Sequence, residues 1–207
     1  MGSIIKKFNL LPLVMLVTIT CLLLASGCTR YARNVNTLYE PAANVSGGAG
    51  EVYIVIPESQ QSRSSDIKWV LGKVKDDDNN NIDEVFSARS PAEIIQTAFA
   101  RELKRSGYTV IPATRRPAAE KLVIDLSKTE INLEQTSDLA DLKVNCLVRV
   151  WVDVIKDGQQ IKQLQYEATS SKTDIKDRDM LARNVLEDAL QSIMLKAVPE
   201  LHNMFNH

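Results

Sequence analysis

The side chains best suited to nucleophilic or metal chemistry are few in this chain of 207 residues, which has three cysteines and two histidines. Both histidines, His202 and His207, lie at the end of the chain, where termini commonly fray. A histidine-based triad or a cysteine–histidine pair therefore lacks its base. The sequence also has no Cys-x-x-Cys or His-Glu-x-x-His spacing for zinc and no P-loop. We therefore expect a protein that is not an enzyme and that holds no metal and no cofactor.

Two groups of acidic residues offer weaker alternatives. The run Asp76-Asp-Asp-Asn-Asn80 has oxygen ligands at the spacing of the first three positions of a calcium loop. Asn81 and Ser87 stand where that loop needs its glycine and its bidentate acid, so a solvated hairpin tip is the stronger interpretation. Asp153 and Glu167 are the candidate pair for a hydrolase. They are expected on the outer face of a hairpin, where carboxylates are more often surface charges.

The N-terminal segment has the layout of a secretory signal. Lys6 and Lys7 precede an apolar run over 10–24, which is followed by Leu24-Ala-Ser-Gly-Cys28. The run is shorter than the roughly 20 residues that a helix needs to cross a bilayer core. A cleaved signal over 1–27 is therefore expected instead of a permanent transmembrane span.

The end of this signal resembles the lipobox of bacterial lipoproteins, although Ala25 stands where a large aliphatic residue is usual. The resemblance implies cleavage between Gly27 and Cys28 and attachment of diacylglycerol and palmitate to the Cys28 thiol. Two or three acyl chains give stable anchoring. Thr29 follows the cysteine where enterobacterial lipoproteins retained in the inner membrane have Asp, which favours the periplasmic face of the outer membrane over the inner membrane. The alternative is a plain signal peptide that leaves Cys28 as a free thiol or a disulfide partner.

The remaining chain is predicted to form a single domain. Residues 28–50 are polar and small, end in Gly47-Gly-Ala-Gly50, and are expected to be a lipidated N-terminus and flexible linker. Residues 51–207 are expected to form a single periplasmic α+β domain, since 44% hydrophobic and 25% charged residues are ordinary globular values. Cys146 lies in an apolar strand pattern and is expected to be a small buried hydrophobe.

Composition argues against a nucleic-acid partner. Aromatic residues make up 5% of the chain, too few to build stacking platforms for bases. Without the two lysines of the signal, 23 basic residues face 26 acidic ones, a net charge of −3. The expected partners are the membrane, through the lipid on Cys28, and other envelope proteins or lipids.

Hydrophobic periodicity indicates an α+β fold in which two long helices cover one face of a mainly antiparallel sheet. Strands are expected over 52–56, 67–75, 82–88, 108–111, 121–133, 142–155 and 160–171, and helices over 90–106 and 178–198. Ser90-Pro-Ala-Glu93 is a strong helix start and Gly107 a helix stop. Pro199 is expected to end or kink the second helix.

The clearest pattern is the alternation of apolar residues over 144–154, which predicts a long half-buried strand. Asp157-Gly158 marks the hairpin that follows it. A two-residue loop would place Leu164 opposite Trp151 and mismatch the apolar faces. We therefore expect a loop of odd length, Lys156-Asp-Gly158, with Gly158 left-handed.

Basic residues are predicted to gather near the end of the first helix and to contact anionic lipid headgroups or lipopolysaccharide phosphates. These residues are Arg101, Lys104, Arg105, Arg115 and Arg116. On the helix, Arg101, Glu102, Lys104 and Arg105 lie mostly outside the apolar stripe. The alternative is that the helix cations complement the helix dipole and that the others lie in a solvated loop.

The chain resembles the uncharacterised YajG-type lipoproteins of Gram-negative bacteria over essentially its whole mature length. The most specific block runs from Ser87-Ala-Arg-Ser90 through the helix to Arg105-Ser-Gly-Tyr-Thr-Val110. The resemblance implies a location and a fold more than a mechanism. A non-catalytic binding or envelope-assembly module is the favoured function. The alternative is an accessory lipoprotein of lipid or lipopolysaccharide transport, which predicts an apolar pocket between sheet and helices.

Overall fold

Each expected strand and helix is present, and the fold is α+β. The computed structural model describes residues 33–62, 68–117, 121–137, 141–174 and 178–206. The strands are β1 (Glu51–Val55), β2 (Trp69–Lys75), β3 (Asn81–Ser87), β4 (Thr109–Ala113), β5 (Leu122–Ser137), β6 (Leu142–Lys156) and β7 (Gln159–Asp174). The helices are the short 3-10 turn η1 (Glu58–Gln60), α2 (Pro91–Ser106) and α3 (Arg178–Asn206).

The seven strands form one mixed sheet, so the expectation of a mainly antiparallel sheet is wrong. Strand β5 pairs with β6 along one side, and its other side pairs with β1 near one end and with β2 near the other. These contacts of β5 with β1 and β2 are parallel, as is the pairing of β1 with β4. The segment between β1 and β4 contains α2, and a helical crossover is what parallel pairing requires.

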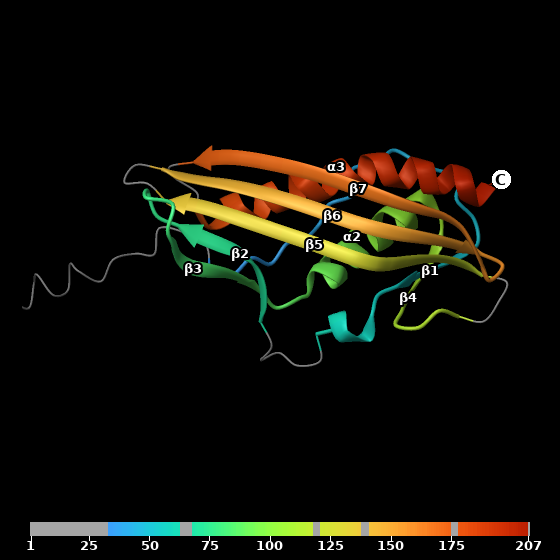
Figure 1. Ribbon diagram of the computed structural model, residues 1–207. Helices are drawn as coiled ribbons and strands as arrows, with labels where there is room; N and C mark the ends of the chain where they lie inside the picture. The colour runs from blue at the N-terminus through green and yellow to red at the C-terminus, as the bar shows by residue number, and fades with distance from the viewer. Residues whose placement is uncertain (1–32, 63–67, 118–120, 138–140, 175–177, 207) are drawn as a thin grey trace, which may run out of the picture. The chain divides into compact units, whose positions relative to one another are not determined.

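Both long helices cover the same face of the sheet, as expected (Figure 1). The even-numbered residues of β6 from Val144 to Val154 are completely buried and face this helical layer. Helix α3 supplies buried residues such as Val185, Leu186 and Leu190. Neither long helix of the described ranges combines the length and apolar character needed to span a bilayer.

The β6–β7 hairpin matches its apolar faces with a β-bulge instead of an odd loop. Its loop has two residues, Asp157 and Gly158, with left-handed φ angles of 53° and 77°. The register shifts beside Ile155, which pairs with Gln160, and Ile161 is left as the extra residue, 46% exposed. The shift places Val152 opposite Leu164, so the faces agree. The left-handed Gly158 is confirmed, and the odd loop is wrong.

Residues 33–50, which we call the strap, run across the helices in extended form (blue in Figure 1). Val35, Thr37 and Tyr39 are buried and alternate with exposed residues, the pattern of a strand. At the glycine-rich end, Gly48 donates a backbone hydrogen bond of 2.8 Å to Ser106. A β-carbon at Gly48 would lie 2.4 Å from the Tyr108 ring, so this glycine allows a close approach. The described part of the expected flexible linker is thus packed on the domain; residues 28–32 lie outside the described ranges.

The ends of α2 follow the capping rules, whereas α3 runs beyond its expected end. Ser90 and Glu93 form a reciprocal capping box, and Gly107 ends α2 with a φ of 109°. Helix α3 continues through Pro199 to Asn206. Leu201 and Phe205, beyond the proline, are buried in the core. Their burial stabilises the last turns of α3 and offsets the loss of the backbone hydrogen bond that a proline cannot form.

We predict that Glu93 contributes stability that is lost in acid. Burial raises the pKa of this carboxyl, but hydrogen bonds from Ser62 and Ser90 outweigh burial and hold the pKa below its ordinary value of 4.5. A lowered pKa in the folded state gives stability that is present above pH 4.5 and disappears as the pH falls through the folded pKa. Urea unfolding at pH 7 and pH 3 should show wild type more stable than Glu93→Gln at pH 7, with a smaller difference at pH 3. Exposed Glu84→Gln is the control, and a difference independent of pH would contradict the prediction.

Candidate functional site

A buried carboxyl group holds the strap on α2. Glu102 is completely buried and accepts hydrogen bonds from the Tyr39 hydroxyl and from the backbone N–H groups of Ala42, at 2.6 Å, and Ala43, at 3.1 Å. Burial and the neighbouring Glu102 raise the pKa of Tyr39 above its ordinary range, so its hydroxyl stays a donor. The sequence placed Glu102 mostly outside the apolar stripe of α2. The strap covers that side of the helix, which is why the expectation failed.

Basic side chains of the α2 region hold the strap by its carbonyl groups. Arg101 donates to the carbonyl oxygen of Tyr39 at 2.5 Å, and Arg105 donates to that of Pro41 at 2.6 Å. Just before the helix, Arg89 donates to the carbonyl oxygen of Thr37 at 2.6 Å. An extended segment has no internal partners for these carbonyl groups, so the arginines supply them.

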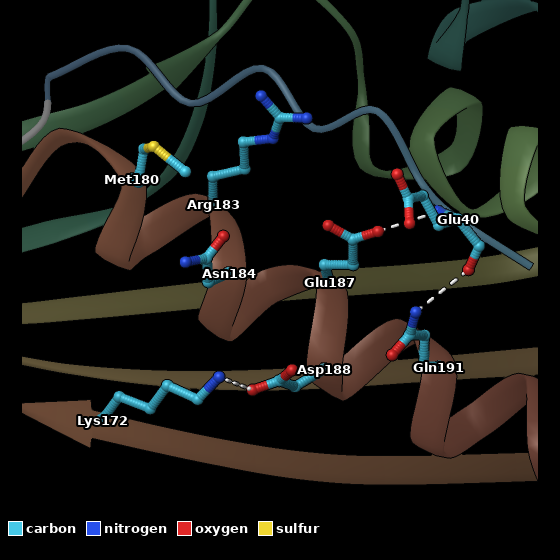
Figure 2. A pocket seen from close by; sticks show the side chains of 8 residues that line it. All are labelled: Glu40, Lys172, Met180, Arg183, Asn184, Glu187, Asp188 and Gln191. Carbon is cyan, nitrogen blue, oxygen red and sulfur yellow. Dashed lines mark hydrogen bonds and ion pairs between the residues drawn. The ribbon is translucent and has the colours of Figure 1, made fainter. Parts of the chain in front are cut away.

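A polar hollow of about 370 Å³ lies between the strap, α3 and the end of β7 (Figure 2). Its charged and amide groups are largely engaged with one another. Glu187 accepts from the backbone N–H of Glu40 at 2.8 Å, and the Gln191 amide donates to the Glu40 carbonyl at 3.0 Å. Lys172 and Asp188 form an ion pair at 2.6 Å. The hydrogen bonds and the ion pair at this hollow therefore join the strap and β7 to α3. Its wall carries side chains of both charges.

The structure brings together three of the five basic residues singled out in the sequence. Arg101 and Lys104 line one hollow of about 210 Å³, and Arg115 lines an adjoining hollow of about 340 Å³. Arg105 donates its hydrogen bond to the Pro41 carbonyl of the strap, as described above. Arg116 is turned to the Asp125 carboxylate, 2.7 Å away. The predicted cluster is thus divided, and three of its five residues line hollows at the surface.

The candidate hydrolytic carboxylates are not brought together. Asp153 accepts hydrogen bonds from the Gln160 and Gln163 amides, at 3.2 Å and 2.8 Å. Glu167 pairs with Arg149 at 2.5 Å, and their strand positions lie four residues along β6 from Asp153. That spacing amounts to roughly 13 Å along a strand. The two carboxylates therefore cannot act on one substrate bond.

The remaining candidates of the sequence are also accounted for. At the tip of the β2–β3 hairpin, the Asp76 carboxylate accepts from the backbone N–H of Asn80 at 2.8 Å, as in a closed polar turn. Cys146 is completely buried, as expected, and burial raises the pKa of its thiol to about 12. A thiol with so high a pKa is a poor nucleophile. Gly27 and Cys28, the predicted cleavage and lipidation residues, lie outside the described ranges.

Comparison with known proteins finds similarity to solved structures alone. No family model matches the chain, and no curated protein does. A Xanthomonas campestris protein of the DUF330 family is 13% identical, with 85% of this chain and 96% of that chain covered and a TM-score of 0.42. An uncharacterised protein is 8% identical, over 82% and 99%, with a TM-score of 0.40. A homologue of a neuraminyllactose-binding hemagglutinin from Helicobacter pylori is 13% identical, over 80% and 89%, with a TM-score of 0.37. The resemblance to YajG-type lipoproteins therefore stays a prediction from the sequence.

We predict that Glu102 is the main attachment of the strap. In Glu102→Ala, two buried donors and one part-buried donor lose their acceptor, and the free energy of unfolding should fall by about 3 kcal/mol or more. Chemical denaturation measures this change. The control is Glu187→Ala, which removes one bond at the more exposed Glu40 backbone and should cost less than about 1 kcal/mol. Equal losses in the two variants would contradict the assignment.

Proposed function

We propose that this protein is a lipid-anchored, non-catalytic binding or assembly module of the bacterial cell envelope. Its anchor is the acylated Cys28, and its expected place is the periplasmic face of the outer membrane. Its partners are envelope proteins or lipids at that surface. The lipobox-like sequence supports the anchor. The lack of a reactive constellation among the described residues supports a binding role over catalysis.

The observation that carries this proposal is the packing of the strap, which begins at Arg33. The backbone of Arg33 and Val35 forms two hydrogen bonds of 2.8 Å with Phe86 of β3, and the Arg33 side chain pairs with Asp83 at 2.7 Å. Only residues 29–32 then separate Cys28 from these contacts. A chain of that length spans at most about 18 Å from Cys28 to Arg33. An acylated Cys28 would hold the domain beside the bilayer.

The transport alternative receives less support from the interior of the fold. It requires a pocket for acyl chains between the sheet and the helices. In the described core, that space holds completely buried side chains from both layers, including Phe99 of α2, Leu186 of α3 and Val150 of β6. The hollows described above lie at the surface, and most of the residues that line each of them have charged, amide or hydroxyl side chains. A module that binds at its surface therefore fits the structure better than a carrier of lipid chains.

We predict that radiolabelled palmitate is incorporated at Cys28. The label should appear in the wild-type protein and in Cys146→Ala, and it should be lost in Cys28→Ala. The reason is that Cys28 follows a lipobox-like sequence and Cys146 does not. Fractionation should find the wild-type protein with membranes and the Cys28→Ala protein away from them. Label that persists in Cys28→Ala, or a wild-type protein that is soluble in the periplasm, would overturn the anchor.

The binding role is tested by affinity purification of the lipidated protein from solubilised membranes. The purification is repeated with the Cys28→Ala variant, which keeps the folded domain and lacks the anchor. We expect the wild-type protein to recover a defined envelope complex that the variant recovers poorly. Recovery of the same proteins in equal amounts by both forms would show that the anchor has no role in binding.

A further inference from the structure

Three cations surround a surface depression formed by two adjoining hollows, which we call the basic hollow. Arg101 and Lys104 come from α2, and Arg115 follows the edge strand β4. Gln96 and Pro112 line both hollows, so the two are continuous. Arg101 and Lys104 are three positions apart on a helix and therefore lie on the same face. The basic hollow thus gathers positive charge from two separate elements.

The described walls of the basic hollow carry no negative charge. Among the residues that the structure describes, neither of its two parts is lined by an Asp or a Glu. The acidic residues of α2 are engaged elsewhere, Glu93 by Ser62 and Ser90 and Glu102 by the strap. Within the described ranges, no ion pair is found for Arg101, Lys104 or Arg115. No side chain of the described ranges therefore neutralises their charges, and an anion would experience a net attraction to these three cations.

Two groups that line the basic hollow are held by hydrogen bonds, and two others are exposed. The Gln96 amide donates to the Ile54 carbonyl at 2.8 Å, and the Arg101 guanidinium donates to the Tyr39 carbonyl of the strap. Lys104 and Arg115 are exposed and can turn toward a ligand. The helix dipole accounts for a cation near the end of α2. It does not account for Arg115, which belongs to another part of the fold.

The hollow in Figure 2 shows what distinguishes the basic hollow. There, Glu40, Glu187 and Asp188 lie among Lys172 and Arg183, and hydrogen bonds and an ion pair connect several of these groups. Opposite charges on one wall cancel much of the field that would attract an ion. As far as the structure describes it, the wall of the basic hollow has cations and amide or hydroxyl groups without carboxylates, so this wall does not cancel the attraction to an anion.

We propose that the basic hollow binds a phosphate group, carried either by a lipid headgroup or by a soluble phosphate ester. Guanidinium groups donate paired hydrogen bonds to phosphate oxygens, and a lysine ammonium adds a point charge. Most of the residues that line the basic hollow have charged, amide or hydroxyl side chains, which suits a headgroup better than an acyl chain. The site is formed by residues of the folded domain and does not depend on acylation of Cys28.

The test is calorimetric titration of the full lipidated chain in uncharged detergent micelles. The probes are inorganic phosphate, glycerol 3-phosphate and short-chain phosphatidylglycerol. The test variant is Lys104→Gln with Arg115→Gln, which keeps Arg101 and therefore the strap. The control is Lys73→Gln with Lys196→Gln, two exposed lysines elsewhere, so both variants lose the same charge. Circular dichroism verifies that both variants remain folded.

We expect at least one phosphate probe to bind the wild-type protein and the control. Binding to the test variant should be about tenfold weaker or more, since two charge-assisted contacts are lost. Binding of the soluble probes identifies a soluble phosphate ester as the source, and binding of phosphatidylglycerol alone identifies a lipid headgroup. The proposal is overturned if no probe binds the wild-type protein, or if the control loses as much affinity as the test variant. Palmitate labelling of Cys28 is unaffected by either outcome.

Discussion

The uninterrupted apolar face of β6 is the constraint on which the rest of the structure depends. Every second residue from Val144 to Val154 is completely buried, and a face of this kind is stable only when another layer excludes water from it. Helix α3 provides that layer, and α2 packs beside it. The strap then lies across both helices, with bonds to Glu102 on one and to Glu187 on the other. The helices thus cover the apolar face of the sheet, and the strap in turn covers part of the helices.

Features governed by local rules could be predicted from the sequence. The capping box at Ser90 and the glycine stop at Gly107 set the ends of α2, and period-two alternation located β6. Pairings between distant segments could not be predicted in this way. Parallel contacts of β1 with β4 and β5 depend on how a helical crossover returns the chain. The hairpin had two solutions that satisfy the same apolar faces, and nothing local chooses a bulge at Ile161 over a longer loop.

The strap and its buried acid were missed for a physical reason. Glu102 has the charge of a surface residue, and the donors that satisfy it lie about sixty positions earlier in the chain. Leu38, which is 58% exposed, breaks the alternation of apolar residues that would have indicated an extended buried segment. The basic cluster was predicted in part. Arg105 and Arg116 are drawn away by a strap carbonyl and by Asp125, partners that only the tertiary fold supplies.

The packing of the strap has a practical consequence for anyone who prepares the domain without its anchor. A recombinant fragment that starts at Glu51, the first residue of β1, would lack Tyr39 and the two backbone donors that satisfy Glu102. It would leave the Glu102 carboxyl without these donors and would uncover the part of the apolar core that Val35 and Ala43 now cover. Such a fragment is prone to aggregate. A fragment that begins between Thr29 and Arg33 keeps the described contacts of the strap and leaves out the lipidation residue.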